Sequence, residues 1–128
     1  MRFARGVFYF EVVTNLLSSG YAMLFPAAFL AQFSDEPLPV AAIEFGRWYA
    51  VLLVVLSLVL WSALRDGTDR FLRPVIGAYL FGDVLQIGVA VRLGMSLGFF
   101  SVGVHAAIWT SVGYAAVRIV YLRMTSGR

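Results

Sequence analysis

The length of its apolar runs is the feature that most constrains this chain. Several of them come close to the ~20 residues that an α-helix needs to cross a bilayer. Only 13% of the 128 residues are charged, about half of the roughly 25% that is typical of globular proteins. A soluble domain of this length would need a more polar exterior. The sequence therefore predicts one small membrane domain over residues 1–128.

Four of these runs predict transmembrane helices. The first follows MRFARG, which resembles the start of a signal peptide, but Glu11 and Asn15 interrupt the apolar core that a signal peptide needs. Pro37, Pro39 and the DGTD stretch predict turns. The expected spans are 7–33, 42–64, 75–93 and 102–122. Because only helices and closed barrels satisfy the backbone in lipid, we expect an all-α fold, an antiparallel four-helix bundle.

The arginines predict the orientation of the spans. The chain has no lysine, and most of its arginines lie near the two termini and in the second connection: Arg2, Arg5, Arg65, Arg70, Arg73, Arg123 and Arg128. The first connection instead carries Asp35 and Glu36. By the positive-inside rule, both termini face the cytoplasm and the connections around SDEPLP and GMSLG face outward. We expect a multi-pass protein of a bacterial-type inner or plasma membrane.

Polar residues in the first and fourth spans predict a buried ion pair. Glu11, Asn15 and Ser18 share one face of the first helix, and a charge there is costly in lipid, so this face should point inward. Arg118 has a similar depth in the fourth span, on its small-residue side, which favours close packing. The small residues recur every four positions: Gly103, Ala107, Ser111 and Ala115. A Glu11–Arg118 pair would act first as a structural clasp, because breaking it leaves an uncompensated charge.

The third span places a carboxyl group near the midplane of the membrane. Tyr79, Asp83 and Gln86 share one face of this helix. An ionisable residue at that depth is a functional hypothesis by default, although a hydrogen bond between helices would also explain it. The sequence leaves both roles open for Asp83.

A second polar group is expected nearer the outer surface. With ~1.5 Å of rise per residue, Arg47, Gln86 and His105 have similar depths, and Asp83 lies about one turn deeper. These residues would form a polar funnel or two separate clusters, and His105 could instead line a subunit interface. A metal site is not expected, because His105 is the one histidine, cysteine is absent and HExxH-like spacing is missing.

The leading functional hypothesis is a small intramembrane enzyme or binding protein for a lipophilic molecule, with acid-base isomerisation or cyclisation as the reaction. A desolvated carboxylic acid could donate a proton while the bundle excludes water. The candidate catalytic residues are Asp83 as the acid, with Glu11 and His105 as base or relay groups. The candidate substrate-binding residues are Tyr79, Gln86, Asn15, Arg47 and Trp109.

Two alternatives stay open at this point. One is a homo-oligomeric, proton-coupled transporter or ion pathway that uses Glu11 or Asp83. The other is a non-catalytic subunit of a larger membrane complex. The chain has no P-loop or GxGxxG motif and no plausible Ser, His, Asp set, so we expect no cofactor and no nucleotide or hydrolase chemistry. The expected partners are membrane lipid, a lipophilic small molecule and further protein chains, and no nucleic acid.

The middle third of the chain carries a resemblance to a known family. Glu44, Arg47 and Tyr49 open the second span in EFGRWY, and Gly82 and Asp83 form a Gly-Asp pair in the third. This pattern resembles the DoxX-like small four-helix membrane proteins. The resemblance implies the four-helix architecture, in a group that includes respiratory or quinone-linked subunits.

Overall fold

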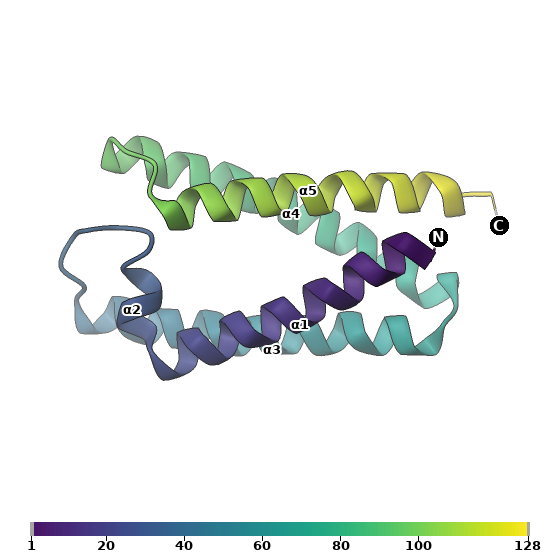
Figure 1. Cartoon of the computed structure of the whole chain (residues 1–128), viewed down its shortest axis with the longest axis horizontal. Coiled ribbons are helices and arrows are strands. Elements are labelled where there is room, and N and C mark those ends of the chain that lie inside the picture. Colours follow the sequence, from purple (N-terminus) through teal and green to yellow (C-terminus); the bar gives the residue numbers. More distant parts are fainter. Residues whose placement is uncertain (1, 128) are drawn as a thin grey trace.

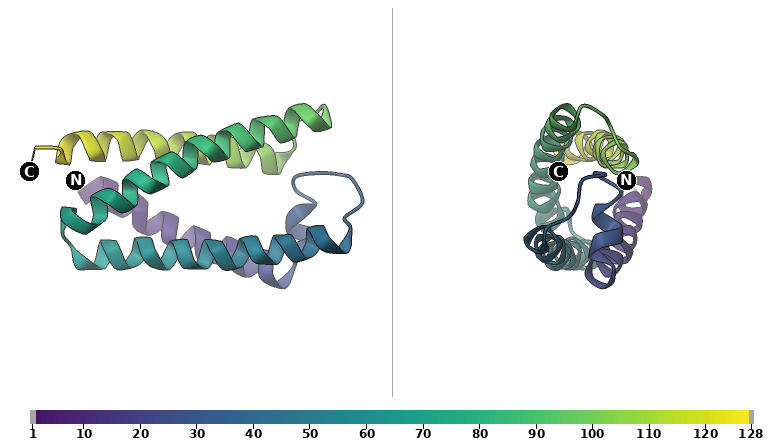
Figure 2. Two further views of the ribbon diagram at one scale, coloured as in Figure 1. Left: turned by 180° about the vertical axis from the view of Figure 1, so that it is seen from behind. Right: turned by 90° about the vertical axis from the view of Figure 1, so that its left-hand side faces the viewer.

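The chain is all-α in the computed structural model, which describes residues 2–127. These residues form five helices and no strand: α1 (Arg2–Leu24), α2 (Pro26–Leu30), α3 (Val40–Asp66), α4 (Asp69–Leu97) and α5 (Val102–Thr125). The four long helices lie as two antiparallel pairs, α1 with α3 and α4 with α5 (Figure 1). The pairs approach each other at the end that holds both termini and the α3–α4 turn, and they diverge toward α2 (Figures 1 and 2).

All four long helices contribute to an apolar core at the end where they converge. Phe8 of α1 and Tyr121 of α5 are fully buried there, with ring centroids 5.6 Å apart in an edge-to-face arrangement, which aromatic pairs favour. The other members of the cluster are Ala4, Val12, Leu60, Ala63, Leu64, Leu72 and Ile76. We call this region the packed end.

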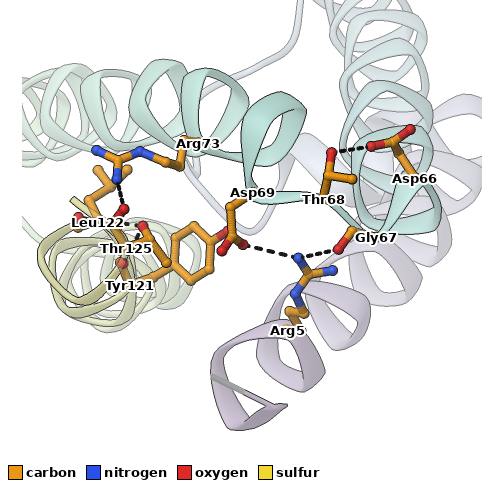
Figure 3. Close-up of polar contacts among 9 residues, drawn as sticks. All are labelled: Arg5, Asp66, Gly67, Thr68, Asp69, Arg73, Tyr121, Leu122 and Thr125. Atoms are coloured by element: carbon orange, nitrogen blue, oxygen red, sulfur yellow. Dashed lines mark hydrogen bonds and ion pairs between the residues drawn. The ribbon is translucent and has the colours of Figure 1, made fainter. Parts of the chain in front are cut away.

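Polar contacts close the rim of the packed end (Figure 3). Arg5 of α1 donates to the Gly67 carbonyl at 2.9 Å and to Asp69 Oδ1 at 3.1 Å. The Tyr121 hydroxyl donates to the same carboxylate oxygen, and Arg73 donates to the carbonyl of Thr125. These bonds tie α1, the α3–α4 turn and α5 together.

The first expected span, 7–33, is wrong as one continuous helix. α1 ends at Leu24, Phe25 leaves the helical conformation with φ −130° and ψ 58°, and α2 begins at Pro26. Proline has no backbone N–H and its ring clashes with the preceding helical turn, so a helix breaks before it. The prediction misses this break because the long apolar stretch around Pro26 suggests one continuous helix.

The other expected spans match helices that extend further than predicted. α4 runs through Leu97 and so takes in most of GMSLG, which was expected as a connection. The chain turns instead at Gly98, which has a φ of 74°. Glycine adopts this backbone conformation without steric cost. Within the DGTD stretch, Gly67 ends α3 in the same left-handed conformation, with φ 76°.

Two of the described helices, α3 and α4, are long and apolar enough to cross a membrane. Within their most apolar windows, only 28% of the residues of α3 and 17% of those of α4 are buried. A helix at the core of a soluble protein would bury most of that surface. The apolar side chains of α3 and α4 therefore face mainly outward.

Candidate functional site

Arg118 of α5 joins two carboxylates from two other helices. Its guanidinium is fully buried and donates from Nη2 to Glu11 Oε1 on α1 and from Nη1 to Asp83 Oδ2 on α4. The ion pair expected between Glu11 and Arg118 is thus present, and Asp83 joins it. We call these three residues the charged triad. It links three of the four long helices.

Two aromatic rings flank the guanidinium of the triad. The Arg118 Cζ atom lies 5.1 Å from the ring centroid of Tyr79 and 5.3 Å from that of Tyr114, within the range of cation–π attraction. The Tyr79 hydroxyl donates to the carbonyl of Leu56 on α3. Tyr79 therefore extends the triad to the fourth long helix.

The triad is unbalanced in both charge and hydrogen bonding. Two carboxylates face one guanidinium, so the three ionised groups sum to one negative charge. Among the described residues, Glu11 Oε2 and Arg118 Nε are buried side-chain atoms with no hydrogen-bond partner. Buried polar atoms are usually paired, so each such atom requires an explanation.

A cavity of about 530 Å³ lies beside the triad. All four long helices line it, and its polar wall includes Glu11, Asn15, Tyr79, Asp83 and Gln86. We call it the inner cavity. These five residues and Arg118 behind them are the sequence-predicted site residues that the fold brings together.

A second cavity of about 560 Å³ lies on the side of α2, and we call it the outer cavity. Its wall is apolar and includes Phe29, Phe33, Leu93 and Val104. Tyr49 and Gln86 line both cavities. The two cavities are therefore neighbours, with a charged wall in one and an apolar wall in the other.

The inner cavity has an opening between α3 and α4. Leu56 and Val59 of α3 line it and are each nearly half exposed. Ala78 and Gly82 of α4 line it from the opposite side and are also exposed. Residues that belong to both the wall and the outer surface mark the mouth of a cavity. A molecule could enter the bundle here from the side.

The segment after α2 is fastened to the start of α5, close to the outer cavity. Gly103 N–H donates to the Gln32 carbonyl at 2.8 Å, and the Ser101 hydroxyl donates to the Phe33 carbonyl at 3.0 Å. A Cβ atom on Gly103 would lie only 2.6 Å from the Gln32 oxygen. Gly103, the first residue of the small-residue stripe of α5, therefore has to be a glycine to allow this backbone contact.

Three of the predicted site residues lie away from both cavities. Arg47 pairs with Glu44 on the same helix, His105 is exposed with its ring centroid 6.0 Å from that of Phe100, and Trp109 is 67% exposed. The expected funnel of Arg47, Gln86 and His105 is not formed. Equal depth did not bring these residues together, because Arg47 and His105 lie on outward faces of their helices.

Sequence reasoning missed two tyrosines and one contact of the site. Tyr114 lies four residues before Arg118, a helical spacing that could have placed its ring next to the guanidinium. Tyr49 was noted only as part of the family resemblance, yet it lines both cavities. The hydrogen bond between Arg118 and Asp83 was missed because only Glu11 was compared with Arg118 in depth and helical face.

Comparison of the chain with protein-family models, curated proteins and solved structures finds no match. The resemblance to DoxX-like proteins stays a prediction. The case for a function therefore rests on the cavities and the charged triad.

Proposed function

We propose that the chain is a small integral membrane protein that binds a lipophilic molecule between its two helix pairs. The observation that carries this proposal is the inner cavity, about 530 Å³ in volume, with a mouth between α3 and α4 and an apolar cavity of about 560 Å³ beside it. Small-molecule sites measure about 300–1,000 Å³ and combine apolar walls with a few polar groups. Both cavities fit this description.

The exposed surface supports a place in the bilayer for all four long helices. Each carries large apolar side chains that are more than half exposed: Phe10 on α1, Leu52 on α3, Val89 on α4 and Val120 on α5. Contiguous apolar surface of this kind is unusual on soluble monomers and suits lipid. In this proposal the helices form an antiparallel four-helix bundle, and the arginine-rich packed end lies in the cytoplasm.

The contacts of Asp83 favour binding over acid-base chemistry. Its Oδ2 accepts a hydrogen bond from the buried Arg118, so Asp83 already has a structural role as a partner in the ion pair that links α4 and α5. His105, the expected relay group, lines neither cavity. We therefore propose binding in place of isomerisation or cyclisation.

The packed end argues against a transport path through a single chain. Phe8, Leu60, Leu72 and Tyr121 are fully buried between the inner cavity and the end that holds the termini. A solute that crossed the membrane would have to displace this core. A binding site reached from the side needs no such displacement.

A neutral fluorescent lipophile tests the binding proposal. N-phenyl-1-naphthylamine should bind saturably to the purified protein in a mild nonionic detergent. Ala78→Trp, which fills the mouth of the inner cavity, should abolish this binding. Val84→Trp is the matched control, since Val84 is exposed on the same helix and lines neither cavity. Absence of saturable binding, or equal binding by the two variants, would contradict the proposal.

Labelling of single cysteines tests the arrangement in the membrane. The chain has no cysteine of its own, so Asp35→Cys and Ser126→Cys each introduce a unique thiol at opposite ends of the bundle. A membrane-impermeant maleimide added to intact cells should label Asp35→Cys alone, and both variants after permeabilisation. Labelling of Ser126→Cys in intact cells would reject the orientation.

A further inference from the structure

The inner cavity presents negative charge that the chain itself does not balance. Among residues 2–127, Glu11 and Asp83 are the two charged residues in its wall, and no basic side chain lines it. Arg118 contacts both carboxylates but is fully buried and is not part of the wall. The wall therefore carries two acidic groups, with one guanidinium behind them.

The other arginines among residues 2–127 line neither cavity, and three of them are engaged elsewhere. Arg5 pairs with Asp69, Arg47 pairs with Glu44, and Arg73 donates to a backbone carbonyl at the packed end. Compensation for the second carboxylate has to come from a proton or from a bound molecule.

Glu11 also has an unused acceptor. It is 4% exposed and lines the inner cavity, and among the described residues its Oε2 accepts no hydrogen bond from a charged group, the neutral amide of Asn15 being the other donor near the carboxylate. A buried carboxylate oxygen without a donor is costly, and a charged donor satisfies it best. A ligand that brings a positive N–H group would supply both the missing donor and the missing charge.

We propose that the cavity selects a lipophilic molecule with a cationic headgroup. The headgroup lies against Glu11 and Asp83 in the inner cavity, and the apolar body extends into the outer cavity past Tyr49 and Gln86. This inference rests on the proposed binding function and adds the chemical class of the ligand.

The same geometry disfavours an anionic ligand. An anion in the inner cavity would face two carboxylates at close range. Arg118 offers it little compensation, because both of its Nη atoms already donate to those carboxylates. Tyr49, whose aromatic face can attract a cation, lines both cavities.

Two ions of nearly the same shape and opposite charge test the inference. Tetraphenylphosphonium and tetraphenylborate are compared by equilibrium dialysis against the purified protein in nonionic detergent, with Ala78→Trp as the background for each. The cation should bind at least about tenfold more tightly than the anion, a difference of about 1.4 kcal/mol. Equal affinities would overturn the inference.

Charge-changing variants then locate the selectivity. Glu11→Gln should weaken binding of tetraphenylphosphonium about tenfold more than it weakens binding of neutral N-phenyl-1-naphthylamine. Glu44→Gln is the matched control, because it removes the same charge from an exposed pair outside both cavities. If the two variants weaken cation binding equally, the carboxylate of Glu11 is not the determinant and the inference fails.

A gain-of-charge variant keeps the test decisive if Glu11→Gln does not fold. Gln86 lines both cavities and has no part in the triad. Gln86→Glu adds a carboxylate of nearly the same size and should tighten tetraphenylphosphonium binding several-fold. If the neutral probe binds in the cavity and Gln86→Glu does not favour the cation, the inference fails while the binding function stands. If neither probe binds, both fail.

Discussion

The packed end and the cavity half of the molecule are built from the same four helices in different ways. At the packed end, Phe8 and Tyr121 fill the space between the helix pairs, and the charged groups lie at the rim. In the other half the pairs diverge, and a buried guanidinium with two carboxylates stands beside open volume. The packed end joins the pairs mainly by apolar packing, and the cavity half joins them by the charged triad and by the hydrogen bonds of Ser101 and Gly103 to the segment after α2.

The two halves contribute differently to stability and to function. In the proposed membrane setting, apolar packing gives little association between helices unless the surfaces fit closely, so the well-filled end would hold the pairs together. The charged triad links α1, α4 and α5 without filling the space around it, and it leaves two buried atoms unpartnered. Such an arrangement costs stability, and a bound ligand could recover part of that cost.

The largest expected effect tests the charge that joins the helices. Arg118→Met leaves Glu11 and Asp83 buried without a counter-charge and should destabilise the folded protein by about 3–5 kcal/mol. Thermal unfolding in detergent, followed by circular dichroism, measures the loss. Arg47→Met is the control, since Arg47 pairs with Glu44 at the surface and should contribute less than about 1 kcal/mol.

A compensated variant separates charge from shape in the same experiment. Glu11→Gln and Asp83→Asn added to Arg118→Met remove the uncompensated charges, and most of the lost stability should return. If the triple variant is as unstable as Arg118→Met, the loss comes from packing of the arginine side chain and the triad does not join the helices by charge.

The next effect concerns the end where the pairs diverge. Gly103→Ala would push a Cβ atom against the Gln32 carbonyl, 2.6 Å away, and should cost up to about 3 kcal/mol. Gly113→Ala in the same helix meets nothing within 4 Å and should be neutral or stabilise by up to about 1 kcal/mol. The same unfolding assay compares them, and an equal change in both would show that the Gly103 contact does not hold the divergent end closed.

A smaller effect compares packing in the two halves directly. Ala63→Val adds two methyl groups at a position that is 7% exposed in the packed core and should cost about 1 kcal/mol. Ala78→Val adds the same groups at the mouth of the inner cavity and should cost almost nothing. Equal losses would mean that the inner cavity is not open space in solution.

Much of the fold follows from simple patterns in the sequence. Apolar run length located the four long helices, and proline and glycine located most of the turns. The break at Pro26 was missed because a long apolar run suggested one continuous helix, whereas the missing N–H and the ring of proline act locally whatever the hydrophobicity around them. Periodicity describes a helix as a whole and does not register a single missing hydrogen-bond donor.

The site was only partly predictable for a related reason. Depth and helical face placed Glu11 opposite Arg118, since both lie on inward stripes of adjacent helices. The same depth argument grouped His105 and Arg47 with Gln86, although the former two face outward. Which faces meet depends on the rotation of each helix about its axis. That rotation is determined by packing between the helices, and this packing cannot be read from one sequence.

The smallest effect concerns the polar rim of the packed end. Tyr121→Phe removes the hydroxyl that donates to Asp69 Oδ1 (Figure 3) and keeps the ring against Phe8, so it should cost about 0.5–1 kcal/mol. Tyr9→Phe on α1 is the control, because Tyr9 is 41% exposed and should be neutral. A loss of several kcal/mol for Tyr121→Phe would mean that the packed end, like the cavity half, is joined chiefly by polar contacts, because the apolar ring contact with Phe8 is unchanged in this variant.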